Sequence, residues 1–86
     1  MTARHPLEIE LYRQIMGDAE CASRGLACTM RTRYGVLLTL HGKPIGVWGV
    51  PIDRLCFRTV DTWETRLIVT EIEEAVSACR DLALAA

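Results

Sequence analysis

The stretch of residues 26–40 alternates between apolar and polar side chains. Its odd positions carry most of the polar side chains, including Arg31 and Arg33. Its even positions are mostly apolar: Leu26, Cys28, Met30, Thr32, Tyr34, Val36, Leu38 and Leu40. Because a β-strand turns successive side chains to opposite faces of a sheet, this alternation predicts one long strand with an apolar face.

A second β-rich run, residues 45–50, follows after the tetrapeptide at 41–44. Gly42 takes a positive φ at no steric cost, which suits the first central position of a tight hairpin turn. The two runs therefore predict a long antiparallel hairpin. Pro51 has no N–H to donate to a neighbouring strand, so it ends the second strand. Residues 55–60 then predict a third strand.

The segment of residues 7–23 has a helical period. Pro6 stands where helices begin, and Gly25 is placed to end the helix in a left-handed conformation. Gly17 lies inside this segment and costs about 1 kcal/mol relative to alanine. The apolar stripe consists of Leu11, Tyr12, Ile15, Met16, Ala19 and Ala22.

The segment that follows the third strand allows two interpretations. Residues 61–64 resemble a capping box that would open one long helix to the C-terminus. The β-branched residues among 62–70 favour a strand instead, and the helical stripe breaks upstream of Ile68. We favour a fourth strand at residues 63–69, followed by a helix at residues 71–84.

These elements predict one α+β domain over residues 1–86. An N-terminal helix, an antiparallel meander of three or four strands and a C-terminal helix follow one another along the chain. We expect both helices to pack on one face of the sheet, the face that carries Met30, Tyr34, Val36 and Leu38.

Composition narrows the possible environments of the chain. Half of the residues are apolar, but no apolar run approaches the ~20 residues that span a bilayer. The N-terminal residues 1–6 lack the apolar core of a signal peptide, so we expect a cytoplasmic protein. The four cysteines, Cys21, Cys28, Cys56 and Cys79, have no paired spacing typical of zinc sites. They are expected to be small buried side chains, and no metal or cofactor is predicted.

Charge is distributed unevenly along the chain. Residues 25–60 contain five basic side chains and one acidic one, whereas residues 61–86 contain two basic and six acidic ones. Such an asymmetry indicates either an anionic partner or electrostatic complementarity inside the fold, and the second interpretation is the simpler.

Catalysis has little support in the sequence. The chain contains only two histidines, His5 near the terminus and His41 in the predicted turn. A catalytic nucleophile needs a nearby base, usually a histidine, and the spacing pairs neither histidine with a nucleophile. We therefore expect a protein that is not an enzyme by itself; the weaker alternative is a small subunit of a multi-chain enzyme.

Association with another protein is the function we favour. If the even face of the first strand is buried, Leu37 points outward, and so does either Val47 or Trp48. Tryptophan and arginine are enriched at interface hot spots. We predict a binding surface on the outer sheet face made of Arg31, Arg33, Trp48 and Arg58, with a protein partner or a second copy in a homodimer. The alternative is nucleic-acid binding through the same basic face.

Overall fold

The structure, a computed structural model, describes residues 5–30, 35–51 and 53–85. The elements are α1 Pro6–Met16, α2 Ala19–Ser23, β1 Leu26–Met30, β2 Val36–Leu40, β3 Lys43–Gly49, β4 Leu55–Thr59, β5 Thr65–Val69 and α3 Ile72–Ala85. All strand pairs are antiparallel and the strands follow one another in the order β1-β2-β3-β4-β5. The α+β class with a helix at each end is confirmed, but the sheet has five strands, not three or four.

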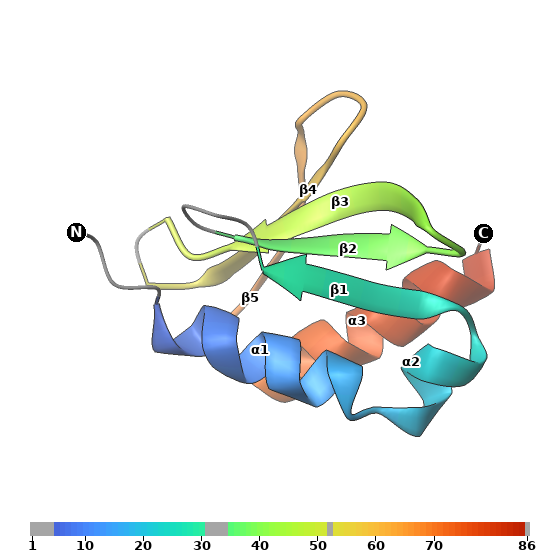
Figure 1. Ribbon diagram of the computed structural model, residues 1–86. Coiled ribbons are helices and arrows are strands. Elements are labelled where there is room, and N and C mark those ends of the chain that lie inside the picture. Colours follow the sequence, from blue (N-terminus) through green and yellow to red (C-terminus); the bar gives the residue numbers. More distant parts are fainter. Residues whose placement is uncertain (1–4, 31–34, 52, 86) are drawn as a thin grey trace.

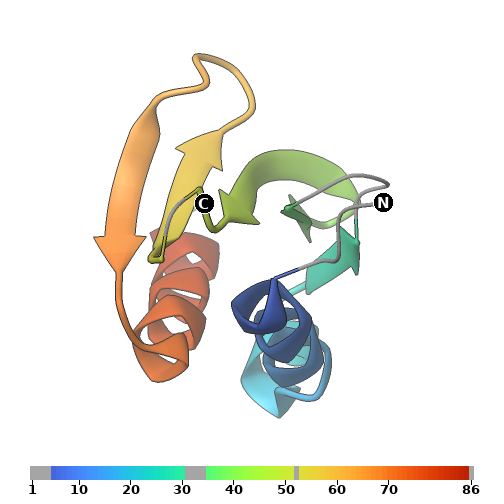
Figure 2. The ribbon, with the colours of Figure 1, turned by 90° about the vertical axis from the view of Figure 1, so that its left-hand side faces the viewer.

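The three helices lie on one side of the sheet (Figure 1). An end-on view shows that the sheet is strongly curved, with α3 beside β4 and β5 and with α1 beside β1 (Figure 2). We call the face that is turned toward the helices the inner face, and the opposite one the outer face.

The prediction of one long strand over residues 26–40 is wrong. This stretch forms β1 and β2, which pair with each other so that Leu26 faces Leu40 and Met30 faces Val36. Gly35, directly before β2, has a φ of 88° that few other residues adopt. Residues that face each other across a ladder point to the same side of the sheet, so the even positions stay on one face in a hairpin just as in a straight strand. The alternation of apolar and polar residues therefore could not distinguish a hairpin from one long strand.

The β2–β3 turn differs from the prediction in the position of its glycine. Gly42, with a φ of 83°, occupies the second central position of the β2–β3 turn, after His41 with a φ of 52°. Positive φ at both central residues is typical of the type I′ turn, whose twist matches that of a hairpin.

The N-terminal helical segment breaks at Gly17, and Asp18 begins α2 by accepting a hydrogen bond at 2.9 Å from the Cys21 amide.

The ambiguous segment after β4 is a strand, as favoured, since β5 covers Thr65–Val69. The C-terminal helix is confirmed as α3 at Ile72–Ala85.

One ion pair joins α2 to α3. The guanidinium of Arg80 donates two hydrogen bonds to the Asp18 carboxylate, one of them from Nε to Oδ2 at 3.1 Å. Arg80 therefore holds the pKa of Asp18 well below its usual range, and Asp18 raises the pKa of Arg80. Arg24 adds a hydrogen bond of 3.2 Å to the Arg80 carbonyl.

A second polar contact joins α1 to the start of β2. Glu8 is buried in the first turn of α1, and its carboxylate accepts a hydrogen bond of 2.6 Å from the Gly35 amide. This contact fixes the end of the β1–β2 connection against the helix.

The core lies between the inner face of the sheet and the helices. Trp48 and Phe57 lie at its centre, with ring centroids 5.1 Å apart. Phe57 can lie over β3 because Gly46 has no side chain: a Cβ there would come within 2.2 Å of the Phe57 ring. The buried apolar residues that pack together are Leu11, Ile15, Cys21, Leu26, Cys28, Val36, Leu38, Leu40, Trp48, Leu55, Phe57, Ala75, Val76 and Cys79.

The prediction that Trp48 belongs to an exposed binding surface is therefore wrong. Its side chain is 0 % exposed. The sequence required only that one of the neighbours Val47 and Trp48 point outward, and the structure turns Val47 outward instead. The larger side chain fills the wide space above the helices.

Candidate binding site on the outer sheet face

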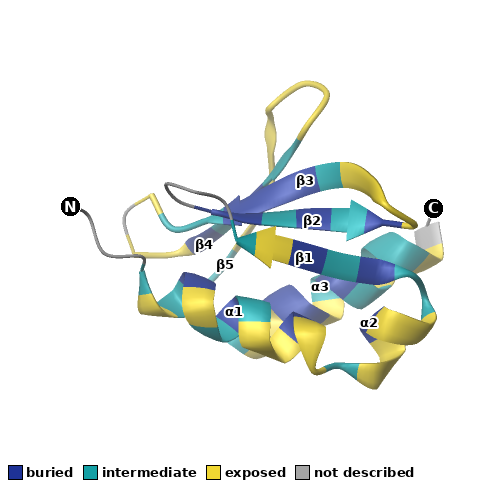
Figure 3. Cartoon of the chain, in the orientation of Figure 1, coloured by how far each residue is buried: buried dark blue, intermediate teal, exposed yellow. Residues whose placement is uncertain are grey.

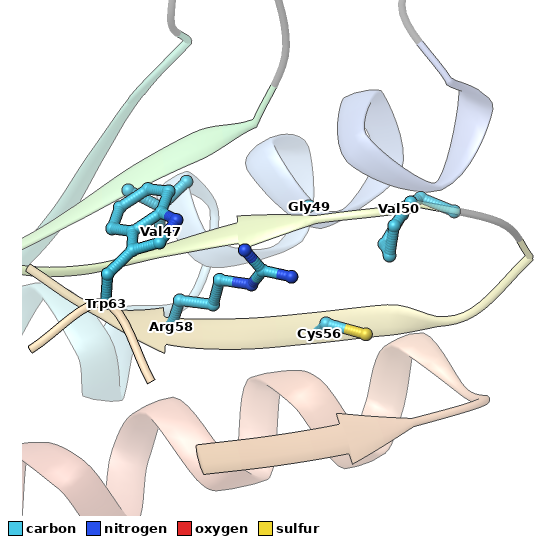
Figure 4. A pocket seen from close by; sticks show the side chains of 7 residues that line it. Val47, Gly49, Val50, Cys56, Arg58 and Trp63 are labelled. Carbon is cyan, nitrogen blue, oxygen red and sulfur yellow. The ribbon is translucent and has the colours of Figure 1, made fainter. Parts of the chain in front are cut away.

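The outer face of β3 and β4 contains a hollow of about 210 Å³. Its floor comes from the strand positions that alternate with the core residues, and its far wall comes from the connection between β4 and β5 (Figure 4). Most of the lining is apolar. The residues that line it are Val47, Gly49, Val50, Pro51, Cys56, Arg58 and Trp63.

Trp63 forms the wall of this hollow. It lies in the β4–β5 connection, which is exposed along its length (Figure 3). Its φ of 59° is unusual for a bulky residue and costs free energy of about 1–3 kcal/mol. Such a conformation persists only where the surrounding contacts impose it.

Hydrogen bonds within the connection impose this conformation. The Trp63 amide donates to the Thr59 carbonyl at 2.9 Å, and the hydroxyls of Thr59 and Thr62 lie 2.9 Å apart. The Asp61 carboxylate accepts from the Thr62 amide at 2.8 Å, which lowers the pKa of Asp61. These bonds order the backbone of the connection, and Trp63 itself is 42 % exposed.

Arg58 stands beside the indole. Its guanidinium carbon lies 5.9 Å from the centre of the Trp63 ring, within the range of a cation–π contact. The nearby carboxylates have other partners, since Asp61 binds Thr62 and Glu64 lies 3.8 Å from Arg66. Among residues 5–30, 35–51 and 53–85, none places a carboxylate within 4.0 Å of the Arg58 guanidinium.

A second hollow continues the first along β4. It is lined by Pro51, Asp53, Arg54, Cys56 and Ile68, and it shares Pro51 and Cys56 with the first. Ile68 is 61 % exposed on the edge strand β5. Arg54 and Asp53 are only loosely paired, at 4.0 Å, and both are well exposed. We call the two hollows together the outer groove.

Of the predicted site residues, Arg58 alone lies in this groove. Trp48 is in the core, and Arg31 and Arg33 lie outside the residues that the structure describes. Trp63 is not among the site residues predicted from the sequence. A tryptophan at a polar turn directly after a strand is the signal that could have identified it.

Internal charge complementarity, the simpler explanation of the charge asymmetry, is not seen among the described side chains. Their ion pairs lie within residues 1–24, within 25–60 or within 61–86, or join Arg80 to the first of these segments. None joins the basic segment to the acidic one. Among the described residues, the charge of Arg58 on the outer face is thus available to solvent or to a partner.

The remaining reactive side chains have structural surroundings. His5 caps α1 by accepting a hydrogen bond of 3.1 Å from the Leu7 amide. Burial raises the pKa of Cys21 to about 11 and those of Cys28 and Cys79 to about 12, so these thiols stay neutral. Burial of these three cysteines is confirmed, whereas Cys56 is half-buried on the outer face.

The described part of the chain contains no group of three or more histidine, cysteine or acidic side chains placed to hold a metal ion. Nor does any helix within it have the length and apolar character needed to cross a membrane.

Comparisons of this chain with protein-family models, with curated proteins and with solved structures find no match.

Proposed function

We propose that this chain is a small non-enzymatic binding protein, an accessory, adaptor or inhibitor, that associates with another protein through the outer groove. One observation carries the proposal: Trp63 is half-exposed beside an apolar hollow, on a loop backbone that is held by its own hydrogen bonds. An exposed tryptophan beside an arginine matches the residue types that dominate protein–protein binding energy. A loop backbone that is already ordered also loses little entropy on binding.

The edge strand β5 supports association of two copies as well. It pairs only with β4 in the described sheet, most of its residues are exposed, and its sequence is rich in residues that favour strands. An open edge of this kind is a template for a further strand. We therefore propose a homodimer at micromolar concentration, which sedimentation velocity would detect; a monomer throughout would contradict it.

We also propose a cytoplasmic location. All four cysteines are free, and a reducing compartment keeps thiols in that state.

Affinity purification from the native host tests the protein-binding function. The wild-type chain should retain a protein in stoichiometric amount, and Trp63→Ala should lose it. Met16→Ala is the matched control, because it also removes an exposed apolar side chain but lies at the end of α1, in the helix layer. Retention by both variants would contradict the proposal.

Nucleic-acid binding is the second candidate, because an arginine beside an exposed aromatic ring is also a platform for stacking bases. In that case the retained material is nucleic acid, and its binding weakens steeply with salt.

A further inference from the structure

We infer that the occupant of the outer groove is an extended, acidic segment of a partner protein, which places an aromatic or large aliphatic side chain under Trp63 and a carboxylate on Arg58. This inference rests on the proposed function and adds the chemistry of the partner. The size of the hollow, its unbalanced charge and its direction along β4 support this inference.

The size of the hollow under Trp63 favours a single side chain. Its volume of about 210 Å³ is below the ~300–1,000 Å³ of pockets that enclose drug-sized molecules. Its floor, Val47 and Cys56, is apolar and offers no side-chain amide or carboxylate to orient a polar ligand. The face of the Trp63 indole forms one wall (Figure 4). Aromatic rings stack well against such a wall.

The positive charge of Arg58 at this end of the groove favours a carboxylate as its ligand. Arg58 has no carboxylate partner among the described residues, and it lies between an apolar floor and an indole, where water screens it less than on an open surface. A guanidinium presents parallel N–H groups that fit a carboxylate in two-point contact. An acidic partner side chain would therefore complement Arg58 both in charge and in shape.

The direction of the groove favours an extended segment. Arg58 and Cys56 point to the same face at alternate positions of β4, and Arg54, directly before β4, lines the second hollow together with Cys56. A chain that lies along β4 would pass from one arginine to the other over Cys56 and Ile68. A second acidic residue near Arg54 would extend the same charge pattern.

The surroundings of Trp63 argue against a nucleic-acid strand. Asp61 and Glu64 flank Trp63 in the sequence and are both exposed, so their charges repel a chain of phosphates. A peptide carries its negative charge only where an acidic residue stands, so it can avoid these two carboxylates.

Peptide titration followed by NMR tests the inference with the full chain. The probes are acetylated nine-residue peptides of serine and glycine that carry one phenylalanine and one glutamate, separated by one to four residues. The indole N–H signals of the two tryptophans are assigned with Trp63→Phe. At one or more spacings we expect a saturable shift of the Trp63 signal and none of the Trp48 signal.

The carboxylate is tested by exchanging glutamate for glutamine in the best peptide. We expect about tenfold weaker binding, the scale of one hydrogen bond to a charged group. Arg58→Gln should abolish the difference between the two peptides. Arg13→Gln should preserve it, because Arg13 is an exposed arginine on α1, in the helix layer on the other side of the sheet.

Three outcomes overturn the inference: equal binding of the glutamate and glutamine peptides, no shift of Trp63 by any peptide at millimolar concentration, or tighter binding of an eight-nucleotide oligouridine than of every peptide. The first two leave the proposed function standing if a purified partner protein still depends on Trp63. If no partner depends on Trp63, the proposed function fails by itself.

Discussion

The two tryptophans of this chain lie fifteen positions apart and have opposite surroundings. Trp48 is 0 % exposed at the centre of the core, against Phe57. Trp63 is 42 % exposed, in a left-handed backbone conformation beside Arg58. Local hydrogen bonds hold the backbone at Trp63, whereas tertiary packing holds the Trp48 side chain. Trp48 is therefore a side chain that the fold needs for its core, whereas Trp63 is one that the core does not need.

The largest expected effect separates the two directly. Trp48→Ala should lower the free energy of unfolding by about 3–5 kcal/mol, because a large buried ring is replaced by a cavity. Trp63→Ala should lower it much less, by about 1 kcal/mol, because Trp63 is 42 % exposed and the change removes only contacts on the outer face and one cation–π contact. Urea unfolding measures both. Equal losses would show that Trp63 is part of the core.

Replacement of Gly46, two residues before Trp48, should give the next largest loss of stability. Gly46→Ala places a Cβ within 2.2 Å of the Phe57 ring and 2.7 Å of the Arg58 carbonyl oxygen. Phe57 must move, and it is the partner of Trp48. The expected loss is about 1–3 kcal/mol, the cost of overpacking, with a change in the near-ultraviolet circular dichroism of the buried tryptophan. Unchanged stability would mean that the core is less tightly packed than the distances indicate.

The cysteines repeat the comparison with smaller side chains. Cys79 is fully buried on α3, whereas Cys56 lies on the outer face. Cys79→Ala should cost about 1–2 kcal/mol, and Cys56→Ala should stay within about 0.5 kcal/mol. Metal analysis should find no zinc in stoichiometric amount, and unfolding of the protein by a chelator would contradict this prediction.

Two arginines provide the smallest and most selective contrast, because Arg80 has a carboxylate partner and Arg58 has none among the described residues. Because the pKa of Asp18 is lowered in the folded protein, its ionised carboxylate stabilises the fold at pH values above the ordinary carboxyl pKa of 3.8. This stabilisation is lost as the pH falls below that value. Asp18→Asn or Arg80→Gln should therefore flatten the acid side of the stability profile. Arg58→Gln should leave that profile as it is in the wild type.

The regular elements could be predicted where one pattern allows one structure. The helix predicted at residues 71–84 and the strand predicted at 55–60 are confirmed as α3 at Ile72–Ala85 and β4 at Leu55–Thr59. The hairpin of β1 and β2 could not be separated from a single strand, because Met30 and Val36 are partners and lie on the same face in both cases. Gly35, with a φ of 88°, is the one described residue of the connection between the two strands, and a single glycine within an alternating pattern is compatible with a strand as well as with a turn.

The candidate site was predictable only in part. Arg58 followed from strand alternation, since Leu55 and Phe57 fill the core and Arg58 must point away. The choice between Val47 and Trp48 depended on the space above the helices, which the sequence does not contain. Trp63 depends on hydrogen bonds of Thr59, Asp61 and Thr62 within one loop, and these were not apparent from apolar periodicity.

The central claim is that Trp63 acts in binding and not in folding. The most direct test is the dissociation constant of the co-purified partner protein, measured for the wild-type chain and for Trp63→Ala at equal folded concentration. The account predicts at least a 30-fold weaker complex, which corresponds to about 2 kcal/mol for a hot-spot tryptophan, with nearly unchanged stability. An unchanged dissociation constant would contradict the account.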